Sequence, residues 1–333
     1  MSSVAENVND ARVVLEVSGL VKRFPIKGGL VRHEIGQVHA VEDVSFVVHE
    51  GETFSIVGES GCGKSTTGKC VLRLIEPTSG SVKLDGKEFT TLTGEDLTRE
   101  RRKMTLIFQD PYSSLNPRMT VGDIIAEPID IAGIYATREE RDARVEQIME
   151  EVGLDLAFKN RYPHEFSGGQ RQRIGIARAI VMQPELVICD EPVSALDVSV
   201  QAKVINLLKQ LQREMGLAYV FISHDLSVVK HISDTVMVMY LGHEMELASK
   251  EELFGNPLHP YTKALLDVIP RIRSERVQDK RILEGDVPSP TNPPSGCCFH
   301  TRCPFATDRC KSEVPAKHEV TPGHFCSCHL YDN

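Results

Sequence analysis

The sequence predicts an α/β fold with a parallel sheet, on three observations. An apolar, β-prone run at residues 54–57 turns through glycines into a helical pattern near Lys64. The stretch "ELVICDEP" places a second apolar run directly before Asp190 and Glu191, and a third such run ends before His224. An apolar strand buried on both faces belongs to a parallel sheet, and it delivers the side chains that follow it to the carboxyl edge.

The composition describes an ordinary globular chain. Its 333 residues allow one large domain with an appendage, or two modest domains. No apolar run approaches the roughly 18 residues that a membrane-spanning helix needs. The start, "MSSVAENVNDARV", lacks the basic and apolar regions of a signal peptide, so we expect a cytosolic protein. The net charge of −9 disfavours a broad electrostatic contact with nucleic acid.

The glycine turn after the first strand matches a phosphate-binding motif. Residues 58–65, GESGCGKS, fit G-x-x-x-x-G-K-[ST] in full. Glycines let backbone N–H groups approach phosphate oxygens, Lys64 can reach the β- and γ-phosphates, and Ser65 can bind magnesium. A chance glycine-rich turn is the alternative, but the strand before and the helix after favour the motif. The expected nucleotide-binding residues here are Gly58, Glu59, Ser60, Gly61, Cys62, Gly63, Lys64, Ser65 and Thr66.

Asp190 and Glu191 supply the carboxylates that such a loop requires. Asp190 is expected to hold magnesium, and Glu191 to act as general base on the attacking water. An apolar run that ends in two acidic residues is weak evidence alone, since many buried strands end in this way. Downstream of a phosphate loop it becomes strong.

A second anion site is predicted at residues 167–170. In "FSGGQRQRIGIARAI", the residues Ser167, Gly168, Gly169 and Gln170 precede a helical pattern. A Ser-Gly-Gly turn at a helix N-terminus binds anions in its own right. One chain has no evident need for a second, distant phosphate site, whereas two chains that face each other do.

These motifs together resemble the nucleotide-binding subunits of ABC transporters, over roughly residues 12–265. The resemblance implies a P-loop NTPase with a RecA-like core and antiparallel β and helical subdomains, the helical one at about 110–170. A small Cys-rich extension would follow at 266–333. In this family two subunits sandwich two ATP molecules with Mg²⁺, and each phosphate loop pairs with the Ser-Gly-Gly-Gln signature of the partner.

Further roles follow from the same resemblance. Gln109 in "LIFQDP" resembles the glutamine that touches magnesium and senses the γ-phosphate. His224 resembles the switch histidine that orients water beside Glu191, although a lone histidine at a strand end has a plainer explanation. Phe24 falls where the family stacks an aromatic ring on adenine, or it is a core residue. The D-loop, which crosses the dimer interface, would be Ser194, Ala195, Leu196 and Asp197.

The stretch "TREERDARVEQIMEEVGL" predicts an amphipathic helix. Val145, Ile148, Met149 and Val152 recur at helical spacing among charged residues. The plain interpretation is a solvated helix. By resemblance it belongs to the helical subdomain, whose exposed side docks onto membrane subunits.

Three stretches resemble one branch of the family, the dipeptide and oligopeptide importer ATPases, which also includes nickel importers. They are residues 110–128, residues 256–266 and the cysteine-rich tail. The branch implies two membrane permeases, a substrate-binding protein and two different ATPases. This chain resembles the F-type, so a D-type partner in a heterodimer is expected, peripheral on the cytoplasmic face of the membrane. The rivals are a soluble ABC ATPase acting on nucleic acid or ribosomes, and a metal-sensing regulator with a vestigial ATPase.

The tail is expected to bind metal. After about residue 266 the chain turns Pro- and Ser-rich, and such a segment needs a source of order besides apolar burial. Four cysteines match a family motif that holds a [4Fe–4S] cluster in some members: Cys297, Cys303, Cys310 and Cys328. Four thiolates suit that cluster or zinc, with iron–sulfur favoured over zinc, and both over free thiols. Cys298 and Cys326 are the expected spares, and His300, His324 and His329 are the substitutes if the metal is zinc.

Overall fold

The computed structural model describes residues 11–28, 33–110, 112–268 and 285–332. The chain divides into two compact units that interleave along the sequence. The first unit takes Met1–Glu16, Val47–Glu52 and Lys83–Val220, and the second takes Val17–Phe46, Thr53–Val82 and Phe221–Asn333. Part of the expected 266–333 extension, residues 269–284, lies outside the described residues, as does the start of the chain. No helix in the described ranges is both long and apolar enough to cross a membrane.

Parallel strands form the centre of the second unit. Its sheet has the order β11-β12-β10-β9-β3. β3 (Thr53–Val57) is buried throughout and pairs in parallel with β9 (Thr235–Tyr240), whereas β10 (His243–Ser249) returns antiparallel to β9. The tail adds β11 (His318–Thr321) and β12 (His324–Cys326) to the free side of β10. The tail is therefore ordered in part by strand pairing.

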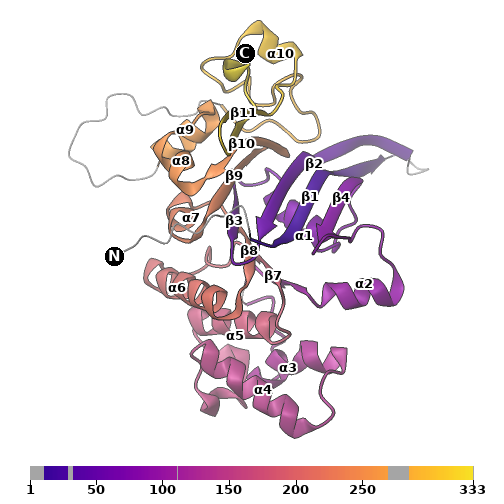
Figure 1. Ribbon diagram of the computed structural model, residues 1–333, viewed down its shortest axis with the longest axis vertical. Helices are drawn as coiled ribbons and strands as arrows, with labels where there is room; N and C mark the ends of the chain where they lie inside the picture. The colour runs from indigo at the N-terminus through magenta and orange to yellow at the C-terminus, as the bar shows by residue number, and fades with distance from the viewer. Residues whose placement is uncertain (1–10, 29–32, 111, 269–284, 333) are drawn as a thin grey trace, which may run out of the picture. The chain divides into compact units, whose positions relative to one another are not determined.

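Two long strands, β2 and β1, and two shorter ones form a separate sheet in the order β2-β1-β4-β5. They are β1 (Val13–Gly28), β2 (His33–His49), β4 (Ser79–Leu84) and β5 (Lys87–Glu88). The remaining helices of the second unit are α1 (Lys64–Val71), α7 (Leu226–Ile232), α8 (Lys250–Gly255), α9 (Pro260–Asp267), α10 (Asp308–Ser312) and the 3₁₀ turn η4 (His329–Tyr331). α8 and α9 contact β10, and Figure 1 shows both helices beside it.

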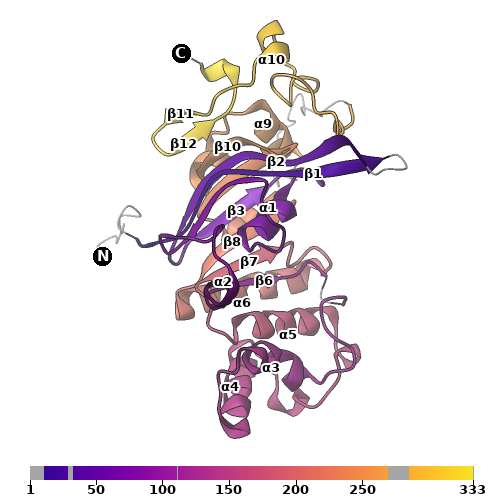
Figure 2. The same cartoon turned by 90° about the vertical axis from the view of Figure 1, so that its right-hand side faces the viewer.

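The first unit combines a parallel strand pair with a group of helices. β6 (Met104–Ile107) and β7 (Leu186–Asp190) run parallel, with Met104 opposite Leu186. Helices α3, α4 and α5 contact one another and lie together in both views (Figures 1 and 2). The helices are α2 (Gly94–Arg101), α3 (Val121–Ala132), α4 (Arg138–Glu151), α5 (Gly168–Ile180) and α6 (Val198–Met215), with 3₁₀ turns η2 (Leu156–Phe158) and η3 (Pro163–Glu165). β8 (Ala218–Ser223) spans the division between the units.

The predicted amphipathic helix is confirmed as α4. The four apolar residues that predicted it, from Val145 to Val152, are all fully buried. The Thr137 hydroxyl accepts the Glu140 N–H at 3.3 Å, and the Glu140 carboxylate accepts the Thr137 N–H at 3.4 Å. This reciprocal capping satisfies two of the N–H groups that a helix start leaves without partners.

A buried glutamate ties the tail to the second unit. Glu246 on β10 is fully buried, and its carboxylate accepts the backbone N–H groups of Leu258 and His259, each at 2.8 Å. His324 of β12, also fully buried, lies with Nε2 2.7 Å from Glu246 Oε1. A buried carboxylate is tolerated only when such partners replace its lost hydration.

His259 is a buried cap at the start of α9. Its Nδ1 accepts the Tyr261 N–H at 3.0 Å, and only 1% of the residue is exposed. Burial lowers the pKa of His259 from 6.5 to about 4, because the protonated ring would lose its hydration. The folded chain therefore holds this ring neutral at pH values where the unfolded chain protonates it.

We expect His259→Asn to flatten the acid dependence of stability. Below pH 6.5 the unfolded state binds a proton that the folded state excludes until about pH 4, so folding weakens as the pH falls through this window. As the pH falls, the free energy of unfolding of the wild type should decrease faster than that of the variant, by a difference that approaches about 1.4 kcal/mol per pH unit. Asn keeps a cap at this position. Urea unfolding between pH 7 and pH 4.5 measures the difference, and the exposed His164→Asn is the control. Parallel pH curves for wild type and His259→Asn would contradict the assignment.

Candidate active site

The phosphate-binding motif forms a loop between a buried strand and a helix. β3 ends at Val57 and α1 begins at Lys64, as the sequence predicts. Lys64 is buried, and its ammonium donates to the carbonyls of Gly58 and Glu59, each at 2.9 Å. Ser65 and Thr66 follow in the first turn of α1 and are half-buried. Lys64 thus lies across the loop in which it is predicted to bind nucleotide phosphates.

Two glycines of this loop are required by packing. Gly58 and Gly63 have positive φ angles of 151° and 106°. A Cβ atom at Gly58 would lie 2.2 Å from the carbonyl oxygen of Met239, and one at Gly63 would lie 2.1 Å from that of Ala40. Sequence reasoning explained these glycines by access to phosphate. Close approach to neighbouring backbone is a second, independent reason.

Glu191 is held in a strained and oriented position after β7. Asp190 ends this buried strand and is itself buried. Glu191 has a φ of 47°, in the left-handed region that costs a non-glycine residue free energy. Its Oε2 accepts the Gln109 Nε2–H at 2.8 Å, and its carbonyl accepts the Ser194 N–H at 3.2 Å. The structure therefore joins three predicted site residues: Gln109, the expected base Glu191, and Ser194, the first residue of the predicted D-loop.

The Ser-Gly-Gly-Gln segment begins α5 with reciprocal capping. The Ser167 hydroxyl accepts the Gln170 N–H at 3.4 Å, and Gln170 Oε1 accepts the Ser167 N–H at 3.1 Å. Gly168 and Gly169 form the first turn. A Cβ atom at Gly169 would lie 2.5 Å from Val200 Cγ1, so this glycine lets α5 and α6 approach closely.

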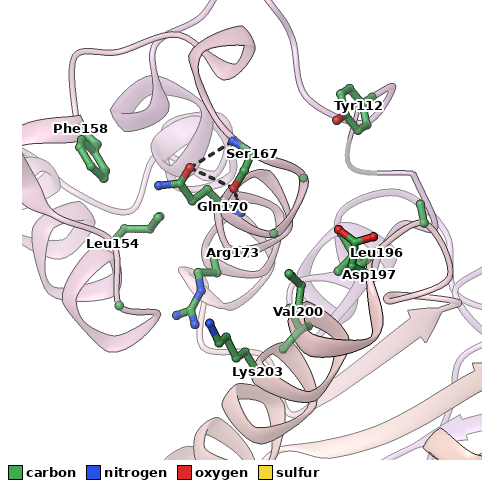
Figure 3. A pocket seen from close by; sticks show the side chains of 15 residues that line it. Tyr112, Leu154, Phe158, Ser167, Gln170, Arg173, Leu196, Asp197, Val200 and Lys203 are labelled. Carbon is green, nitrogen blue, oxygen red and sulfur yellow. Dashed lines mark hydrogen bonds between the residues drawn. The ribbon is translucent and has the colours of Figure 1, made fainter.

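A cavity of about 450 Å³ opens beside this segment (Figure 3). The predicted signature residues line it together with Ala195, Leu196 and Asp197 of the predicted D-loop. Arg173 of α5 and Lys203 of α6 also line it, and two cations favour an anionic occupant. Sequence reasoning missed both cations, because a helical pattern alone does not show which charged residues face a cavity.

Two further predicted residues lie at strands. His224 follows β8 directly, as predicted, and is exposed. Phe24 lies on β1 and is half-buried, with the Lys22 ammonium 4.8 Å from its ring centroid. Phe24 is therefore not a fully buried core residue. The adenine-stacking role that the resemblance gives it stays a prediction, as do the roles of the other site residues.

The predicted metal ligands gather without forming a metal site. The Cys297 N–H donates to the Cys310 carbonyl at 2.8 Å. Burial, together with the nearby Cys297, Cys303 and Cys310, raises the pKa of Cys328 to about 11. All nine cysteines are free. Even so, no three or more His, Cys, Asp or Glu side chains among the described residues are placed to hold a metal ion.

The expectation that the tail needs metal for its order was incomplete. Cys298 and Cys326, the expected spares, are buried, and Cys326 packs with Leu258 and Cys328 beneath Val320 and Tyr331. The histidines named as substitute ligands have other contacts. His324 pairs with Glu246, His329 Nδ1 lies 2.7 Å from Asp332, and His300 Nδ1 lies 2.9 Å from the Cys297 carbonyl. Packing and ion pairs therefore supply much of the order that was assigned to metal.

Two protein families match the chain. The ABC transporter family matches residues 41–194. The family described as oligopeptide/dipeptide transporter, C-terminal region, matches residues 245–310. The first match covers the phosphate loop, the signature and Asp190, and the second reaches three of the four predicted cysteine ligands.

Full-length relatives are found in Bacillus subtilis (strain 168). The oligopeptide transport ATP-binding protein AppF is 54% identical over 96% of this chain and 97% of its own length. The putative oligopeptide transport ATP-binding protein YkfD is 56% identical over 96% of each chain. Both relatives align with the cysteine-rich tail as well as with the ATP motifs, since so little of either chain is left out.

Among solved structures, the fold resembles the dimeric structure of a post-hydrolysis state of the ATP-binding cassette MJ0796 bound to ADP and Pi. The TM-score is 0.63 at 29% identity, over 71% of this chain and 98% of that one. CbiO1 from Clostridium perfringens, part of the ABC transporter complex cbiONQ, gives a TM-score of 0.63 at 25% identity. These neighbours confirm the expected α/β cassette fold, whereas the expected domain boundaries stay predictions. The chain belongs to the ATP-binding proteins of the ABC transporter family, and it carries the C-terminal region of the oligopeptide and dipeptide transporters.

Proposed function

We propose that this chain hydrolyses ATP to power the import of oligopeptides, as one ATPase subunit of an ABC transporter. One observation carries the proposal of hydrolysis. The Glu191 carboxylate, at the end of a buried strand, is oriented by Gln109 at 2.8 Å as a general base must be. The peptide substrate is supported by relatives that are named oligopeptide transport ATP-binding proteins and align over nearly the whole chain.

The residues take the roles that their motifs suggest. Lys64 binds the phosphates, and Glu191 accepts the proton of the attacking water while His224 orients it. By their motifs, Ser65, Gln109 and Asp190 would hold magnesium, which would neutralise charge on the transferred phosphoryl group. The N–H groups at the start of α5 point their positive helix end at a phosphate of the ATP on the partner subunit.

ATP shifts the population of the paired subunits toward their closed state. Only the closed pair of subunits places a phosphate loop and a signature on the same nucleotide, so ATP favours the closed state by its differential affinity. Hydrolysis leaves separated phosphate charges in the interface, and the pair reopens. The membrane permeases follow these two states and carry the substrate.

The finer assignment is an F-type chain paired with a D-type ATPase on the cytoplasmic face of the membrane. Two permeases hold the pair there, and a substrate-binding protein delivers peptide to them. The resemblance to the F-type branch supports this arrangement. Nickel or another small solute is the alternative cargo, because no residue of an ATPase subunit touches the cargo.

The cysteine tail is proposed to take up a [4Fe–4S] cluster, with zinc as the alternative. The donors fit in kind: four thiols, Cys297, Cys303, Cys310 and Cys328, lie close enough to influence one another's charge. They do not fit in placement as described, so binding requires their rearrangement and the loss of thiol protons. No step of ATP hydrolysis depends on this group.

We expect Glu191→Gln to abolish turnover while ATP still binds. Loss of a general base lowers kcat by about 100- to 10,000-fold. The isosteric amide keeps the space of the carboxylate but accepts no proton, so the closed pair should accumulate with ATP. Phosphate release by the assembled transporter, together with equilibrium ATP binding, measures both effects.

Glu214→Gln is the matched control for this variant. Glu214 on α6 also accepts a glutamine amide, from Gln210 Nε2 at 3.0 Å, but it is exposed and outside the motifs. Turnover should be unchanged. Wild-type turnover by Glu191→Gln would show that another group is the base.

Ser167→Ala should separate capping from function. α5 begins with Ser167 and Gln170, and α4 begins with Thr137 and Glu140 in the same reciprocal arrangement. Ser167→Ala and Thr137→Ala each remove one cap, and each should cost about 1 kcal/mol of stability. Only Ser167→Ala should also lower ATP-dependent closure and turnover in the complex. Equal turnover in the two variants would argue against an ATP contact at Ser167.

Metal analysis of the full chain, purified without oxygen, tests the tail. We expect about four iron and four sulfide per chain for a cluster, and their loss in Cys303→Ser. Cys298→Ser is the control, because its thiol lies 3.8 Å from the Tyr240 carbonyl and is an expected spare. One zinc without sulfide would replace the cluster with a zinc site. If the protein contains neither iron nor zinc, packing is the whole source of order in the tail.

A further inference from the structure

The phosphate loop and the cysteine-rich tail meet at a half-buried ion pair. Arg302 Nη1 lies 2.7 Å from Glu59 Oε2, and Nη2 lies 3.2 Å from Oε1. The Arg302 side chain is 7% exposed and that of Glu59 27%. A two-point contact between guanidinium and carboxylate is directional, and removal from solvent makes it stronger than an exposed pair. The second residue of the loop is therefore fixed by a residue of the tail.

Aromatic side chains fix the position of this arginine. Phe299, three residues earlier, packs with its ring centroid 5.3 Å from those of Tyr240 and Tyr261. All three aromatic residues are fully buried. Arg302 Nη1 also donates to the Tyr240 hydroxyl at 3.5 Å. The tail thus inserts Phe299 and Arg302 together as one anchor.

The same cluster holds the backbone of Glu59. The Tyr261 hydroxyl accepts the Glu59 N–H at 3.0 Å. Glu59 is therefore held at its N–H by α9 and at its carboxylate by the tail. Both contacts lie within the second unit.

The charge of Glu59 gives the contact a consequence. Glu59 is the one carboxylate among residues 58–66, a loop that must accept a polyanion. An uncompensated carboxylate there would repel phosphate oxygens and would also compete for Lys64. Arg302 neutralises this charge and holds it at a fixed position.

We propose that Arg302 is a positioning residue for nucleotide binding, acting through Glu59, so that docking of the tail sets the affinity of the loop for ATP. The inference rests on the proposed function, because it requires that the loop bind ATP. Arg302 itself need not touch the nucleotide. Because coupling between sites is reciprocal, ATP must also stabilise the docked tail by the same factor.

The test compares Mg·ATP affinity across variants of the full chain by calorimetric titration. Arg302→Gln leaves Glu59 uncompensated and should raise Kd by about fivefold or more. Arg302→Lys keeps the charge but not the two-point contact, and should fall between this variant and wild type. The double variant Glu59→Gln with Arg302→Gln removes both charges and should return Kd toward the wild-type value. A merely structural role of Arg302 predicts no such rescue.

Arg309→Gln is the matched control. Arg309 precedes Cys310 as Arg302 precedes Cys303, and it also makes an ion pair, with Nε 2.7 Å from Glu313 Oε2. It is 51% exposed, and its partners Glu313 and Asp332 belong to the tail itself. Its Kd for ATP should equal that of wild type.

Hydrogen exchange of the wild-type chain gives a test that needs no variant. ATP should slow amide exchange in residues 297–303 as well as in the phosphate loop. Protection of the loop with unchanged exchange in 297–303 would overturn the inference, as would equal Kd values for wild type and Arg302→Gln, or a double variant as weak as the single one. A wild-type chain that binds no ATP would instead overturn the proposed function.

Discussion

The conformation of the phosphate loop depends on two backbone contacts that leave no space for a side chain. Gly58 and Gly63 approach the carbonyls of Met239 on β9 and Ala40 on β2 so closely that no Cβ atom fits. The Gly242 N–H adds a hydrogen bond to the Cys62 carbonyl at 2.9 Å. The strands around the loop thus fix its shape. A site formed before the ligand arrives loses little conformational entropy on binding.

Glu191 also has a positive φ angle, but this position is not occupied by glycine. Glycine would remove the strain of its φ of 47°, but glycine has no carboxylate. The chain instead keeps a strained glutamate. Gln109 holds its carboxylate, and the N–H and hydroxyl of Ser194 both hold its carbonyl. Strain of this kind persists only where the surroundings fix the residue, and it gathers at functional positions. The loop needs backbone and uses glycine, whereas the acidic site needs a side chain and accepts the cost.

Local patterns in the sequence were sufficient for the elements that carry the motifs. The buried runs before Gly58, Asp190 and His224 became β3, β7 and β8, and helical spacing located α4, because both periodicities are set within a few residues. Contacts between distant residues left no such trace. Glu246 and His324 are 78 positions apart, and Glu59 and Arg302 are 243 apart. Nothing in the spacing of the cysteines showed that Phe299, Cys298 and Cys326 would be buried among them, so the polar composition of the tail led to a metal as its main source of order.

Packing and metal binding make different demands on the same cysteines. In the packed tail the thiols are protonated, since burial raises the pKa of Cys297, Cys303 and Cys328. Metal ligation needs thiolates, so it must release those protons and move the sulfurs from their packed positions. Cys303 is bonded to Arg302. The Arg302 guanidinium is held at Glu59, next to the packed ring of Phe299. Cys303 follows Arg302 directly, so a metal that moved Cys303 would also act on the ion pair between Arg302 and Glu59.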